Sequence, residues 1–207
     1  MSNVKPAAEL RSPLYDFGLA NMAMPVDDSR GVWANEVPAN GFIGLRGSLA
    51  DTAFAEAVEK VLPVPLPSQP CTISVANDTR ILWLSPDEWM IVVPRVRHAA
   101  LLKELTSALN GTRSQVADNS GGYTEVIVLG RDAANVLSHC TVYNLDGLKP
   151  GRIAGTTFGK ASVYLARDGD GFRLLLRRSF ADYIWRFLVR AAAPYKFGIG
   201  RLDGGDA

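Results

Sequence analysis

Two histidines and two cysteines are the residues of this chain best suited to proton transfer or nucleophilic chemistry. A histidine changes its charge near neutral pH and is the commonest general acid or base. His98 lies at the predicted start of one helix, and His139 stands beside Cys140 near the end of another. Because adjacent helical residues point in different directions, His139 and Cys140 are poorly placed to act as base and nucleophile. We therefore expect structural or surface roles for both histidines and no catalytic residue in this chain.

Sequence patterns that bind metals or phosphates are also missing. The chain contains no CxxC pair, no HxxxH pair and no GxxxxGKS or GxxxxGKT motif. The glycines Gly121 and Gly122 precede a predicted strand, whereas the glycines of a dinucleotide-binding loop follow one. We therefore expect this chain to bind no metal and no cofactor.

The cysteines Cys71 and Cys140 leave two redox states open. Their spacing and surroundings are not those of a secreted disulfide framework, which favours buried free thiols over a disulfide. No signal peptide is visible, and no apolar run approaches the roughly 18 residues of a membrane span. These features predict a cytoplasmic protein.

Charge and composition exclude two classes of partner. The 207 residues contain 22 Lys and Arg against 21 Asp and Glu, a formal net charge of +1, and 47% are hydrophobic. Proteins that bind nucleic acid or a membrane surface need a strong basic excess, so we expect neither partner. The hydrophobic fraction predicts a globular chain with a sizeable core.

Residues 1–40 are expected to form an extended N-terminal arm. Prolines recur through this segment and its apolar residues follow no clear period, which disfavours long helices and central strands. The segment is too apolar for a solvated tail, so it should lie across the chain's own core or across a partner. Aromatic side chains anchor interfaces, and we therefore take Phe17 and Trp33 as candidate partner contacts. Arg177 and Arg178, which precede a predicted helix, either bind an acidic partner surface or are solvated.

The rest of the chain reads as a duplication. Residues 41–115 and 116–192 each follow the order strand, helix, strand, strand, helix, and Gly47 recurs as Gly130, 83 positions later. Hairpin turns are predicted at residues 85–88 and 168–171. The pattern predicts an α+β fold with two pseudo-symmetric modules, mainly antiparallel sheets and a C-terminal tail over residues 193–207.

Five segments in a fixed order resemble the sarcosine oxidase gamma subunit family. They are residues 82–89 (LWLSPDEW), 118–124 followed by 128–130 (DNSGGYT and VLG), 145–146 with 150–151 (LD and PG), 156–161 (TTFGKA) and 178–185 (RSFADYIW). The resemblance covers about residues 40–190. It implies a fold like the folate-binding domain of aminomethyltransferases, which agrees with the duplication.

The resemblance also implies a place beside alpha, beta and delta subunits in a heterotetramer. That complex oxidises sarcosine to glycine, yields hydrogen peroxide and, with tetrahydrofolate, 5,10-methylenetetrahydrofolate. In the family, FAD, FMN, NAD and folate are associated with the larger subunits and zinc with delta, so gamma is expected to be non-catalytic. Two alternatives stay open: a free-standing folate-binding protein of the aminomethyltransferase type, and a gamma-like subunit of an N-methyl amino acid dehydrogenase. Residues 148–151 lack the cysteine and Gln-Glu of folate-dependent relatives, which weakens the first alternative.

Overall fold

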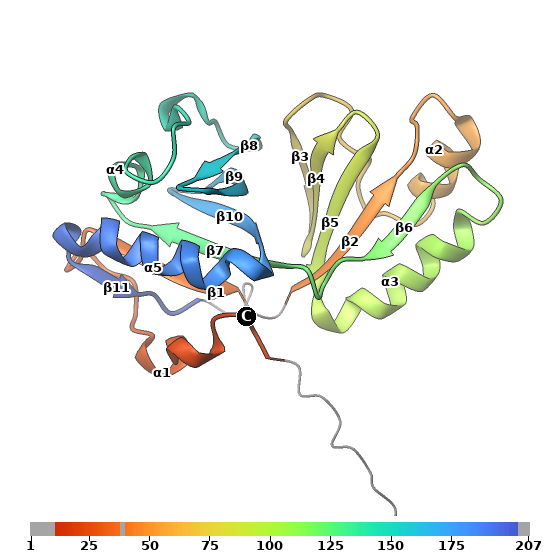
Figure 1. Cartoon of the computed structure of the whole chain (residues 1–207). Coiled ribbons are helices and arrows are strands. Elements are labelled where there is room, and N and C mark those ends of the chain that lie inside the picture. Colours follow the sequence, from red (N-terminus) through yellow and green to blue (C-terminus); the bar gives the residue numbers. More distant parts are fainter. Residues whose placement is uncertain (1–10, 38–39, 203–207) are drawn as a thin grey trace, which may run out of the picture.

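Two β-sheets with helices on their outer sides make up the structure, a computed structural model that describes residues 11–37 and 40–202 (Figure 1). Every strand pair but one is antiparallel. The α+β class with mainly antiparallel sheets is therefore confirmed. The two predicted hairpins join β4 (Thr79–Ser85) to β5 (Glu88–Pro94) and β9 (Ala161–Asp168) to β10 (Gly171–Arg177).

The five-stranded sheet has the order β3-β4-β5-β2-β6. Its outer face packs on α2 (Thr52–Glu59) and α3 (Arg95–Ala108) through a core that includes Ile43, Trp89 and Leu105. The helix α2 begins where it does because the Asp51 carboxylate accepts hydrogen bonds from the first free backbone N–H groups. The strands are β2 (Asn40–Arg46), β3 (Ile73–Ala76), β4 (Thr79–Ser85), β5 (Glu88–Pro94) and β6 (Gln115–Asp118).

The six-stranded sheet has the order β11-β1-β7-β10-β9-β8. Its outer face is covered by α4 (Ala133–Ser138) and α5 (Ala181–Ala192), whose apolar sides enter a second core. The strands are β1 (Val32–Val37), β7 (Tyr123–Leu129), β8 (Ile153–Phe158), β9 (Ala161–Asp168), β10 (Gly171–Arg177) and β11 (Phe197–Ile199). The parallel pair is β1 with β11.

The duplication is visible in the strand order, with one exchange between the halves. The orders β3-β4-β5-β2-β6 and β8-β9-β10-β7-β1 match position by position. Yet β6 directly precedes β7 in the chain and pairs with β2, whereas β1 precedes β2 and pairs with β7. Each sheet thus takes one strand from the segment that leads into the other half, which ties the two halves together.

Both ends of the chain differ from the expected arm and tail. The described part of the arm, residues 11–37, contains the short helices η1 (Tyr15–Phe17) and α1 (Leu19–Met22) and the strand β1, whose six residues are all buried. The sequence of β1 shows no alternation of apolar and polar residues because both faces of this strand are covered. The segment after residue 192 adds β11 to the same sheet. Residues 1–10, 38–39 and 203–207 lie outside the described residues, so the prediction is not tested there.

Where the two sheets converge, their inner faces pack against each other. Phe42, Met90 and Val92 of the five-stranded sheet form one cluster with Ile153 and Leu175 of the six-stranded sheet. This inner layer is the third hydrophobic core of the described chain, and it surrounds the polar groups described next.

Candidate functional site

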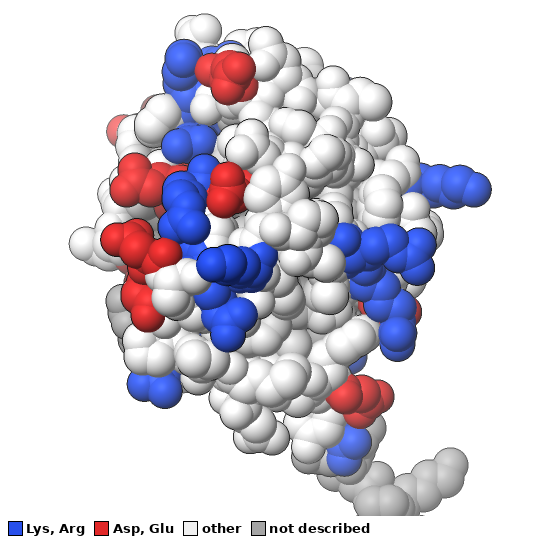
Figure 2. All heavy atoms as spheres, turned by 90° about the vertical axis from the view of Figure 1, so that its left-hand side faces the viewer, with Lys and Arg blue, Asp and Glu red and all other residues white. Residues whose placement is uncertain are grey.

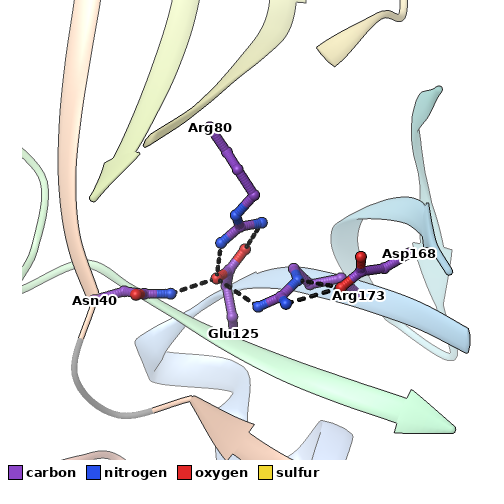
Figure 3. Close-up of polar contacts among 5 residues, drawn as sticks. All are labelled: Asn40, Arg80, Glu125, Asp168 and Arg173. Atoms are coloured by element: carbon purple, nitrogen blue, oxygen red, sulfur yellow. Dashed lines mark hydrogen bonds and ion pairs between the residues drawn. The ribbon is translucent and has the colours of Figure 1, made fainter. Parts of the chain in front are cut away.

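A buried carboxylate, Glu125, lies between the two sheets (Figure 3). Its side chain on β7 is 1% exposed. The Arg80 guanidinium donates to both of its oxygens, over 3.0 and 2.5 Å, and the Asn40 amide donates over 2.6 Å. Arg173 Nη1 lies 3.6 Å away and is itself held by Asp168, over 2.8 and 2.9 Å. These donors already occupy both oxygens of the carboxylate. Glu125 therefore has a structural role: it compensates the positive charges of Arg80 and Arg173 and joins the two sheets.

Sequence analysis missed this network, because its members come from β2, β4, β7, β9 and β10. One signal was present. Glu125 and Arg173 stand in the middle of apolar strand sequences, YTEVIVL and GFRLLLR. A charged residue in such a run is rarely buried without a partner, so each of the two signalled a buried ionic contact without naming its partner.

A second polar cluster joins His98, Ser120 and Asp118, three residue types that also form catalytic triads. The His98 Nε2 atom lies 3.0 Å from Ser120 Oγ and 3.1 Å from Asp118 Oδ1. A triad needs one ring nitrogen for serine and the other for aspartate, whereas here the same nitrogen faces both. Ser120 Oγ also accepts a hydrogen bond from the Phe42 backbone N–H. The cluster therefore fastens the β6–β7 connection onto β2 and α3.

The pKa of Asp118 agrees with that fastening role. Burial is the largest single influence and raises the pKa, but the two hydrogen bonds from Ser120 and the positive charges of His98 and Arg95 outweigh it. The pKa of the carboxyl is therefore lower than usual. Asp118 stays ionised at neutral pH and holds its hydrogen bonds.

The remaining candidates for proton transfer or nucleophilic attack are His139 and the two cysteines. His139 is exposed, with its Nε2 atom 3.0 Å from the Tyr195 hydroxyl. Both cysteines are free thiols: Cys140 is buried and Cys71 is partly exposed. Burial raises the pKa of the Cys140 thiol to about 12, so its reactive thiolate form is scarce.

Residues 11–37 and 40–202 contain neither a cluster of metal-ligating side chains nor a membrane-spanning helix. No group of three or more His, Cys, Asp or Glu side chains among them is arranged to hold a metal ion. No helix in this described part is both long and apolar enough to cross a membrane.

A cavity of about 550 Å³ lies on the inner face of the six-stranded sheet. It is lined by Tyr123, Tyr164 and Arg177, with the Arg177 guanidinium 4.7 Å from the centre of the Tyr123 ring. Burial raises the pKa of both tyrosines. Their hydroxyls are therefore protonated at neutral pH and act as hydrogen-bonding groups, not as bases.

The structure separates the four predicted interface residues. Phe17 is half-buried, edge-on to Trp185 at 6.3 Å, and Arg177 and Arg178 are exposed. Arg178 donates to the backbone carbonyl of Arg11 and so holds the N-terminal segment. Trp33 is a correction: it is 1% exposed, its indole N–H donates to the Asp27 carbonyl, and it belongs to the core. It is buried because β1 lies inside the sheet and not in an arm.

The surface that faces left in Figure 1 carries acidic and basic side chains side by side in one group and a mainly basic group apart from it, with uncharged surface between the two groups (Figure 2). Binding a phosphate backbone needs many basic groups along one track. The charged groups on this face are interrupted and do not form one.

Comparison with known proteins gave matches in sequence and in structure. Residues 46–194 match the sarcosine oxidase, gamma subunit family. A sarcosine oxidase subunit gamma from Arthrobacter sp. is 30% identical over 159 residues, which cover 74% of this chain and 76% of the relative. An aminomethyltransferase from Streptomyces avermitilis is 28% identical over 129 residues, 58% of this chain but only 33% of the relative. The chain thus spans about a third of that relative's length.

Two solved structures superpose on most of the chain. One is a chain of heterotetrameric sarcosine oxidase from Corynebacterium sp. U-96, with a TM-score of 0.81 and 28% identity over 90% of this chain and 96% of that one. The other is the glycine cleavage system aminomethyltransferase T from Bartonella henselae, with a TM-score of 0.69 and 17% identity over 93% of this chain and 60% of that one. The second likeness is one of fold alone, and it confirms the fold expected from the sequence.

Proposed function

Because the chain belongs to the sarcosine oxidase gamma subunit family, we propose that it is the non-catalytic gamma subunit of a heterotetrameric sarcosine oxidase. Its role is to support assembly with alpha, beta and delta subunits. The complex oxidatively demethylates sarcosine to glycine, with production of hydrogen peroxide and 5,10-methylenetetrahydrofolate. FAD, FMN, NAD, tetrahydrofolate and zinc are held by the other subunits.

One observation carries the proposal. The superposition on a chain of heterotetrameric sarcosine oxidase extends over 90% of this chain and 96% of the other. A likeness over nine tenths or more of both chains supports the same role in an assembly, whereas a shared domain supports only a shared fold.

The chemistry-bearing side chains of the described chain support the non-catalytic part of the proposal. Glu125 is compensated by Arg80, His98 is bound to Ser120 and Asp118, and Cys140 is a buried thiol. Each group has a structural partner or position, so none is poised to act on a substrate.

Co-expression tests the proposal. We would place an affinity tag on this chain, express it with the alpha, beta and delta subunits of the same organism, and measure the recovered subunits and hydrogen peroxide production from sarcosine. The expected result is recovery of all four subunits, and a much lower yield of assembled complex when this chain is omitted. Recovery of the tagged chain as a stable monomer beside the other subunits would overturn the proposal.

Two further measurements separate the alternatives. Saturable binding of tetrahydrofolate to the isolated chain, measured by equilibrium dialysis, would favour a free-standing folate-binding protein. A complex that oxidises another N-methyl amino acid in preference to sarcosine would favour an N-methyl amino acid dehydrogenase.

A further inference from the structure

An apolar groove of about 640 Å³ lies between the N-terminal segment, α5 and β11. Its floor is aromatic: Phe17 and Phe197 both contact Trp185 edge-on, with ring centres 6.3 and 6.1 Å apart. The groove is lined by Phe17, Leu19, Met22, Met24, Arg30, Trp185, Arg186, Val189, Arg190, Phe197, Gly198 and Ile199. We call this set the α5 groove.

The wall formed by the N-terminal segment is held in place by backbone hydrogen bonds. The Met24 N–H donates to the Ile199 carbonyl over 3.0 Å, and the Arg201 N–H donates to the Met24 carbonyl over 2.7 Å. Because the N-terminal segment is bonded to the edge strand β11 and α5 packs on the face of the same sheet, the groove is formed before any partner binds. A preformed site loses less conformational entropy on binding.

Exposed apolar side chains are concentrated at this wall. Of the ten large hydrophobic side chains that the described residues expose, four belong to residues 15–26, and two of these, Met22 and Met24 at 51% and 48% exposure, line the groove. Methionine side chains are flexible and polarisable, so they adapt to an apolar partner. A concentration of this kind marks a surface for protein contact.

The charge around the groove is positive. Three arginines line it and no Asp or Glu does. Arg30 donates to the Phe197 carbonyl over 2.8 Å, and Arg186 pairs with Asp182, which lies outside the lining. Arg190 is exposed in the last turn of α5 and has no ion pair within the described part of the chain. The groove therefore offers an apolar floor and a cationic end.

We propose that the α5 groove binds an acidic amphipathic segment of a partner subunit. The apolar side chains of that segment lie on the partly exposed rings of Phe17 and Phe197, beside the methionines, and a carboxylate pairs with Arg190. This assignment rests on the proposed function, because it supplies the assembly contact that a gamma subunit needs. Charge complementarity selects the partner: an acidic segment gains the arginine contacts, whereas a basic one is repelled.

Photo-crosslinking in the co-expressed complex tests the assignment. A benzophenone amino acid placed at residue 22 should crosslink to an acidic, partly apolar segment of the alpha, beta or delta subunit. The control position is residue 75, since Val75 is 59% exposed but lies on β3 of the other sheet. Crosslinks from residue 22 only to a second copy of this chain, or to no other chain, would overturn the assignment.

Two substitutions give a quantitative test. Met22→Asp places a carboxylate in the groove and Arg190→Glu reverses its charge, so each should weaken binding of this chain to the other subunits at least tenfold. Val75→Asp, the matched control, should leave the affinity unchanged, and melting of each variant alone checks its folding. Unchanged affinity of both groove variants beside a wild-type chain that assembles would overturn only the groove assignment. A wild-type chain that does not assemble would overturn the proposed function as well.

Discussion

Replacing Arg80 by methionine should destabilise the protein far more than the same change at Arg46. Both arginines pair with a glutamate, at 2.5 Å for Arg80 with Glu125 and 2.6 Å for Arg46 with Glu88. The difference is burial: the Glu125 side chain is 1% exposed, whereas the Arg46 and Glu88 side chains are 54% and 33% exposed. The comparison therefore isolates the effect of removing charge compensation from a buried carboxylate.

The magnitude follows from the contacts that remain after the substitution. Removing one partner of a buried ion pair costs about 3–5 kcal/mol, because the other charge stays buried. Glu125 keeps the Asn40 hydrogen bond and the Arg173 contact at 3.6 Å, so we expect the lower end, about 3 kcal/mol, for Arg80→Met. An exposed pair contributes at most about 1 kcal/mol, which is the expected limit for Arg46→Met.

Thermal and urea unfolding measure the difference. For a chain of this size, each kcal/mol lowers the melting temperature by about 2–4 °C, so Arg80→Met should lower it by about 6–12 °C and Arg46→Met by less than about 4 °C. The double variant Arg80→Met/Glu125→Leu should recover part of the loss, because it removes the uncompensated charge. The reasoning would be refuted if the free energies of unfolding of Arg80→Met and Arg46→Met agreed within about 0.5 kcal/mol. It would also be refuted if the double variant lost at least as much unfolding free energy as the two single variants, Arg80→Met and Glu125→Leu, lose together.

Three more predictions concern Glu36, Cys140 and Gly130. Burial raises the pKa of Glu36 above its usual 4.5. The wild-type chain should therefore gain stability relative to Glu36→Gln as the pH falls from 7 toward 4.5. Urea unfolding at both pH values measures the difference, and a relative loss of stability on acidification would contradict the prediction. The Cys140 thiol, with its pKa of about 12, should resist a thiol reagent at pH 8 while the partly exposed Cys71 reacts. With a disulfide reagent that releases a chromophore for each thiol it modifies, one equivalent of chromophore is expected from the native protein and two from the protein unfolded in urea. Gly130 has φ +103° and an added Cβ would lie 2.6 Å from a backbone oxygen, whereas Gly169 has φ +52° with open space around it. Gly130→Ala should therefore lower the free energy of unfolding by about 2 kcal/mol or more, and Gly169→Ala by about 1 kcal/mol. Equal losses of unfolding free energy would refute the role of the close contact.

Local patterns in the sequence predicted the elements that depend on local physics. The turns at residues 85–88 and 168–171 predicted the β4–β5 and β9–β10 hairpins, because turn residues set hairpin register over a few positions. The recurrence of Gly47 as Gly130 predicted the duplication, and β2 and β7 start 83 residues apart. The ordered segments also predicted the family, which the comparisons confirm.

The interface candidates show where local patterns are insufficient. Phe17 and Trp33 both lie in an irregular, apolar, proline-rich segment, and the same argument was applied to both. One is half-buried beside the α5 groove and the other is buried in the core. The difference comes from β1, which enters the sheet between β7 and β11, strands that follow it by about 90 and 160 residues.

The sequence by itself determined the helices, the hairpins, the repeat and the family, since each of these is encoded in neighbouring residues or in their order. Only the tertiary structure decided which strand completes each sheet, which charges meet between the sheets, and which apolar side chains remain exposed. Glu125 illustrates the reason: its partners Asn40, Arg80 and Arg173 lie 45 to 85 positions away along the chain. Such contacts depend on long-range strand pairing and on the burial of both sheet faces, and no local periodicity records them.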